Sequence, residues 1–94
     1  MQAFIPLTIK ILVDKRSKDA PFVAFNPELD VASCGLTEEK ARENLKNAVK
    51  IFMEETQKQG KLKETLEELG FQKNKQEWIS PRVSFETFYL PTTK

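Results

Sequence analysis

Apolar and polar residues alternate with a period of two near both ends of the chain and recur every three or four positions in its middle. The first pattern is typical of half-buried strands and the second of amphipathic helices. We therefore predict an α+β domain in the order β-β-β-α-α-β, a two-layer structure with an antiparallel sheet and helices on one face. The predicted strands span residues 4–13, 22–25, 31–34 and 83–90, and the predicted helices span 38–58 and 62–69.

Cap signals define both predicted helices. Thr37 is a suitable N-cap for the long helix, and two glutamates follow it where carboxylates favour the positive end of the helix dipole. Gly60 ends that helix. Gly70 occupies the position where a left-handed C-terminal cap favours glycine, and Phe71 is placed for the accompanying hydrophobic contact. Residues 72–77 are predicted to form a polar loop, with Trp78 and Ile79 covering the open end of the core.

The connection between the second and third strands carries two carboxylates. Asn26-Pro27 ends the second strand, and Glu28, Leu29 and Asp30 follow it. We interpret this as a turn in which Asp30 bonds local backbone and Glu28 is solvated. The alternative is an acid–base pair or Mg²⁺ site that Asp14 could join. Asp14 is expected at the far end of the first hairpin, which disfavours that alternative.

One face of the predicted sheet has no helical layer to cover it. If the strand register is right, four apolar residues lie on that face, and a contiguous exposed apolar patch usually marks a partner. We therefore expect a homodimer, a higher homo-oligomer or a complex with another protein. The predicted interface residues are Phe4, Leu12, Phe88 and Leu90.

Composition narrows the classes of function. The chain has 94 residues, 39% hydrophobic and 31% charged, as expected for a single folded domain over 1–94. No apolar stretch is long enough to cross a membrane, and no signal-peptide pattern is evident. Cys34 is the only cysteine, interpreted as a small half-buried strand residue, and there is no histidine for a nucleophile pair or a metal site. We expect a cytoplasmic protein without a cofactor.

Basic residues on the long helix suggest an alternative function in RNA binding. The net charge is only +1, and glutamates are interleaved with the lysines and the arginine, so a solvated helix face is the favoured interpretation. The strand aromatics could stack on bases, but their alternation is more typical of a core. The basic residues concerned are Lys40, Arg42, Lys46 and Lys50.

The segment 22–53 contains an aromatic strand, a Pro-Glu-Leu turn, a Gly-x-Thr helix start and a helix face with Ala, Asn and Ala. The residues concerned are Phe22 to Leu29, Gly35 to Thr37, Ala41, Asn44, Leu45 and Ala48. This pattern resembles the N-terminal domain of HicB-type antitoxins. The chain departs from the family pattern at Ala20-Pro21, at Asp30-Val31 and at Lys40.

The resemblance implies a partial ribonuclease H-like fold and a non-enzymatic protein that occludes a small, basic, mRNA-cleaving HicA-like toxin. Glu28, Leu29 and Asp30 are the predicted partner-binding residues, because acidic groups at the rim would attract a basic protein. The family's usual C-terminal DNA-binding segment has no counterpart in the pattern, so we expect no direct DNA binding. A structural or regulatory dimer without a toxin, and a weak RNA-binding protein, remain the alternatives.

Overall fold

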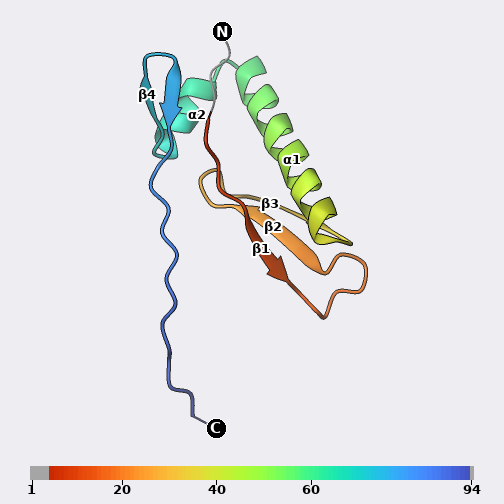
Figure 1. Cartoon of the computed structure of the whole chain (residues 1–94). Helices are drawn as coiled ribbons and strands as arrows, with labels where there is room; N and C mark the ends of the chain where they lie inside the picture. Colours follow the sequence, from red (N-terminus) through yellow and green to blue (C-terminus); the bar gives the residue numbers. More distant parts are fainter. Residues whose placement is uncertain (1–4, 94) are drawn as a thin grey trace.

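A three-stranded antiparallel sheet forms the first layer of the structure, a computed structural model that describes residues 5–93. The strands are β1 (Lys10–Val13), β2 (Phe22–Asn26) and β3 (Val31–Gly35), in the spatial order β1-β2-β3. Figure 1 shows them beside the long helix. The registers pair Leu12 with Val23 and Val23 with Cys34, so these three side chains lie on one face of the sheet.

The second layer is helix α1 (Glu38–Lys58), which lies along the other face of the sheet. It begins where the sequence predicts, because the Lys40 amide donates to Thr37 Oγ1 at 3.0 Å. Ala41 and Leu45 are buried against Ala24 of β2 and form the first core cluster. The predicted two-layer α+β class is therefore confirmed.

Gly35 is where β3 approaches the helix most closely. A Cβ atom at this position would lie 2.6 Å from the Ala41 backbone nitrogen and 2.9 Å from Lys40. Any side chain would push the first turn of α1 away from the sheet. The Asn44 side chain strengthens the same junction, since its Nδ2 donates to the Cys34 carbonyl at 2.8 Å.

Helix α2 (Leu62–Glu68) supplies the second core cluster, in which Leu66 and Phe71 pack on Leu29. The cap predicted after it is present. Gly70 has a φ of 96°, and the Phe71 amide donates to the Leu66 carbonyl at 2.9 Å. Among the described residues, no helix has the length and apolar character that a membrane span requires.

A short hairpin follows α2, where a polar loop was predicted over 72–77. It pairs β4 (Gln72–Asn74) with β5 (Glu77–Ile79). Trp78 is half-buried against the second core cluster, as expected of a residue that covers its end. The loop prediction was wrong. All three β4 residues are polar and exposed, so this strand lacks the apolar alternation by which a strand is predicted.

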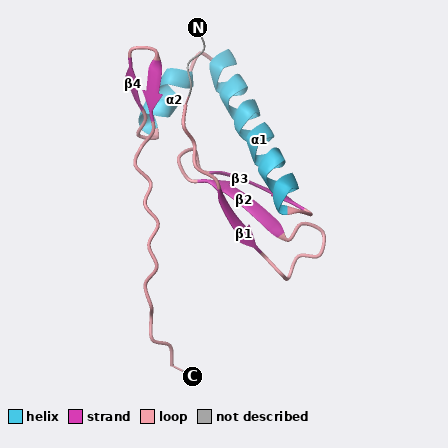
Figure 2. Ribbon diagram, in the orientation of Figure 1, coloured by secondary structure: helices cyan, strands magenta, loops and turns pink. Residues whose placement is uncertain are grey.

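The strand predicted over Val83–Leu90 is an extended arm instead. Residues 80–93 have no strand assignment, and Figures 1 and 2 show them running away from the rest of the molecule. The radius of gyration is 16.1 Å, whereas a compact chain of this length would have about 12 Å. A strand requires a neighbouring backbone, and the arm has none over most of its length.

The first strand is also shorter than predicted, because only Lys10–Val13 pairs with β2. Residues 5–9 lead up to β1 without strand assignment, and Ile5 and Leu7 pack against the second core cluster. Phe4, one of the four predicted interface residues, lies outside the described residues.

We predict that Gly35→Ala lowers the free energy of unfolding by at least about 2 kcal/mol, because the added methyl group overlaps the α1 backbone. Gly60→Ala is the matched control. Its φ is 69° but no atom lies within 4 Å of the added Cβ, so only backbone strain of about 1 kcal/mol applies. Urea denaturation of both variants measures the difference, and equal losses would contradict the close approach.

Candidate functional site

The turn Asn26–Asp30, predicted as an exposed partner-binding rim, is mostly inside the protein. Asn26 is 1% exposed and Glu28 is 7% exposed. Leu29 is buried in the second core cluster. Only Asp30 is exposed to solvent. The prediction that Glu28 is solvated was therefore wrong.

The Glu28 carboxylate faces Thr8, in the segment that leads to β1. The Thr8 amide donates to Oε1 at 2.9 Å, and the Thr8 hydroxyl donates to Oε2 at 2.5 Å. Thr8 lies two residues before the start of β1, where the regular ladder with β2 is absent. The glutamate side chain thus takes the place that a strand backbone would otherwise occupy.

Asn26 completes the same network. Its Nδ2 donates both to the Thr8 carbonyl and to Glu28 Oε1, each at 2.8 Å, and its Oδ1 accepts from the Leu29 amide at 2.8 Å. No buried side-chain nitrogen or oxygen in the described part of the chain lacks a hydrogen-bond partner. We call these three residues, Thr8, Asn26 and Glu28, the carboxylate clamp.

The clamp lowers the pKa of Glu28 below its ordinary value of 4.5. Burial acts to raise this pKa, since it disfavours the charged form. The hydrogen bonds from the Thr8 hydroxyl, the Thr8 amide, the backbone of Glu28 itself and the Asn26 side chain act in the opposite direction and outweigh burial. Glu28 is therefore ionised at neutral pH, and its oxygens are engaged inside the protein.

Asp30 has a different role in the turn. Its φ is 57°, in the left-handed region that aspartate and asparagine adopt more readily than most residues. The chain reverses at this residue and enters β3. Its exposed carboxylate is the one part of the predicted partner-binding set, Glu28, Leu29 and Asp30, that another protein can reach.

No cluster of carboxylates in the described part of the chain supports the alternative of an acidic nuclease or Mg²⁺ site. Arg16 Nε donates to the Asp14 carboxylate at 3.1 Å, and the hydrogen bonds from the Arg16 side chain and backbone lower the pKa of Asp14. Within residues 5–93, no three His, Cys, Asp or Glu side chains come together in a way that could hold a metal ion.

The basic residues of α1 are partly neutralised by glutamates on the same helix. Arg42 pairs with Glu38 at 2.8 Å, and Lys40 lies 3.6 Å from Glu43. All four groups are exposed, so these pairs contribute little to stability. The mixture of charges agrees with the interpretation of a solvated helix face.

The sheet face away from α1 is the most distinctive surface. It is mainly apolar, and no element of the described structure packs over its centre. We call it the uncovered face, and its residues are Lys10, Leu12, Val23, Phe25, Ala32 and Cys34. Leu12 was predicted there. Val23, Phe25 and Ala32 were not predicted to lie on this face, although the period-two alternation of their strands indicates it. Cys34 is exposed, whereas it was predicted to be half-buried.

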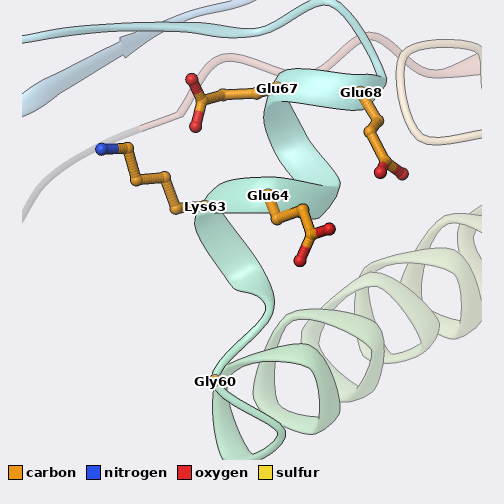
Figure 3. A pocket seen from close by; sticks show the side chains of 5 residues that line it. All are labelled: Gly60, Lys63, Glu64, Glu67 and Glu68. Atoms are coloured by element: carbon orange, nitrogen blue, oxygen red, sulfur yellow. The ribbon is translucent and has the colours of Figure 1, made fainter.

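A shallow hollow lies beside α2, away from this face. It is lined by Gly60 and by four exposed charged residues of the helix, shown in Figure 3. Three of the four are glutamates, and their carboxylates point in different directions (Figure 3). The arrangement does not converge on a common ligand position. The lining side chains are Lys63, Glu64, Glu67 and Glu68.

No family model, curated protein or solved structure matches this chain. The resemblance to HicB-type antitoxins therefore depends on the residues themselves. The structure shows what several of those residues do in this fold: Gly35 allows the close approach of α1, Thr37 caps it and Glu28 holds Thr8. These roles are structural, and they direct attention to the uncovered face as the candidate binding surface.

We predict that Glu28→Gln destabilises the protein by about 1.5–3 kcal/mol at pH 7, because the charge-assisted bonds to Thr8 are lost. The pKa of Glu28 is lowered in the folded state, so its contribution is present above pH 4.5 and is lost as the pH falls through the folded pKa. The difference between wild type and variant should shrink over that range.

Asp30→Asn is the matched control, because it removes an exposed charge from the same turn while keeping a residue that tolerates positive φ. We expect its stability to stay within about 0.5 kcal/mol of the wild type. Urea denaturation between pH 3 and pH 7 measures both variants. A Glu28→Gln protein as stable as Asp30→Asn at pH 7 would show that the clamp contributes nothing.

Proposed function

We propose that this protein is a HicB-like antitoxin: a non-enzymatic, cytoplasmic protein-binding module that neutralises a small, basic, HicA-like mRNA-cleaving toxin by occluding it. The observation that carries the proposal is the uncovered face, a mainly apolar surface on a sheet whose other side is packed against α1. Contiguous exposed apolar surface of this kind is typical of a protein interface. The resemblance of residues 22–53 to the family supplies the class of partner.

Electrostatics support the same class of partner at the edge of this surface. Asp30 lies in the turn between β2 and β3, at one end of the uncovered face, and its carboxylate is exposed. A negative group at the rim of an apolar patch speeds association with a basic partner and disfavours acidic ones. In the proposal, the apolar centre of the face provides affinity and Asp30 contributes to orientation.

A second candidate is a structural or regulatory dimer with no toxin. The extended arm with its exposed aromatic residues favours this candidate, because such a segment provides a means of self-association. The two functions are compatible if self-association and toxin binding use different parts of the sheet. The presence or absence of a toxin gene beside the gene for this protein distinguishes the two functions.

The test is co-expression in bacterial cells with any small basic protein that is encoded next to this one. We expect wild-type protein to relieve the growth arrest and to co-purify with the toxin. Ala32→Arg places a bulky cation on the uncovered face, beside Phe25 of the central strand β2, and should abolish both effects. Lys46→Glu, on the exposed side of α1, is the matched control and should retain both.

Circular dichroism of Ala32→Arg checks that the fold is intact, as expected for an exposed strand position. A wild-type protein that neither relieves arrest nor forms a complex contradicts the antitoxin proposal. Full protection by Ala32→Arg would place the toxin surface elsewhere on the molecule.

A further inference from the structure

The arm, residues 80–93, carries a row of large apolar side chains that are mostly exposed in the chain itself. Phe85, Phe88, Tyr89 and Leu90 are 58%, 75%, 93% and 73% exposed, respectively. No backbone hydrogen bond links the arm to another described residue. Its sequence still alternates like a strand, with Phe88 and Leu90 on one side and Tyr89 on the other. Such a segment is suited to adding to a sheet edge.

The base of the arm is tied to the segment that leads into β1. The Ser80 hydroxyl donates to the Pro6 carbonyl. Farther along, the Lys10 ammonium lies 5.6 Å from the centre of the Phe85 ring. Residue 80 thus lies near residue 6, and residue 85 lies near residue 10. The start of the arm therefore runs parallel to residues 6–10.

The chain's own β1 does not cover the rest of the arm. The contacts at Pro6 and Lys10 involve only the start of the arm, Ser80 and Phe85. Farther along, the arm and β1 diverge (Figure 1), and Phe88, Tyr89 and Leu90 are 75%, 93% and 73% exposed. Their apolar surface is left for another molecule.

A second copy of this chain offers the surface that the arm needs. β1 is an edge strand, paired only with β2 in the described sheet, and its outer backbone groups are available for a further strand. Leu12 and Val13 beside that edge are both exposed. The single charge of β1, Lys10, is opposite in sign to Glu86 of the arm.

We propose that the protein forms a two-fold dimer in which the arm of each copy docks on the β1 edge of the other, with Phe88 and Leu90 against Leu12. Three aromatic rings and a leucine expose roughly 400–600 Å² per arm. Two arms and the two surfaces that receive them therefore supply more than about 1,000 Å², enough for a specific dimer. The arm lengthens the sheet at its edge and leaves the centre of the uncovered face accessible.

The first experiment measures the mass of the purified full chain by light scattering and sedimentation. The wild type should be a dimer of the 10.9 kDa chain. The double variant Phe88→Asp/Leu90→Asp should weaken dimerisation by at least ~100-fold, since it places two charges in an apolar contact. Both side chains are exposed in the single chain, so its circular dichroism should be unchanged.

Ile51→Lys is the matched control for the mass measurement. It also replaces an exposed large apolar residue, 59% accessible, but on α1 rather than on the arm or β1. It should remain dimeric. A monomeric wild type, a dimer that survives the double change in the arm, or loss of the dimer in Ile51→Lys would each overturn the proposal.

Disulfide trapping then locates the contact without relying on loss of binding. In a Cys34→Ser background, Leu12→Cys chains and Leu90→Cys chains carrying different tags are mixed and oxidised. A mixed disulfide dimer is expected, and Ile51→Cys in place of Leu90→Cys should give none. A doubly substituted chain, Leu12→Cys/Leu90→Cys, that closes only on itself in dilute solution would overturn exchange between copies. No toxin is needed, so this outcome is independent of the antitoxin proposal.

Discussion

The fold depends on one buried carboxylate. The Glu28 carboxylate accepts hydrogen bonds from the amide and the hydroxyl of Thr8, which lies twenty positions away in sequence. The Asn26 side chain donates to the Thr8 carbonyl beside it. Proline follows Asn26 and stops β2, so side chains provide the pairing that the strand no longer offers. This clamp holds the N-terminal segment against the sheet. It also places Leu29 in the second core cluster, where α2 and the last hairpin meet the rest of the protein.

The residues that carry the resemblance to HicB-type antitoxins are mainly residues that build this fold. Gly35 allows β3 to touch α1, Thr37 starts the helix, and Asn44 ties the helix to the Cys34 carbonyl. A buried carboxylate that already accepts three hydrogen bonds has little capacity left for a partner. The surfaces available for binding are instead the uncovered face and the exposed arm. The residues of the turn and the candidate binding surface on the sheet are thus separate features of one structure.

Local signals made α1, its N-cap and the C-terminal cap of α2 predictable from sequence, because Thr37, the apolar stripe and Gly70 act within a few residues of where they stand. Glu28 was assigned to the surface because nothing near it in sequence identifies Thr8 as its partner. The alternation in residues 83–90 predicted a strand, but a strand also needs an adjacent backbone, which alternation does not supply. The β4–β5 hairpin was not predicted because every residue of its first strand is polar.

The central claim is that the turn after β2 is a structural clamp whose carboxylate holds Thr8. Amide hydrogen exchange of Thr8 at neutral pH tests it most directly, because this amide lies outside any strand and donates only to Glu28 within the described structure. The account predicts exchange as slow as that of the β2 amides. Exchange at the rate of an unstructured peptide would contradict it.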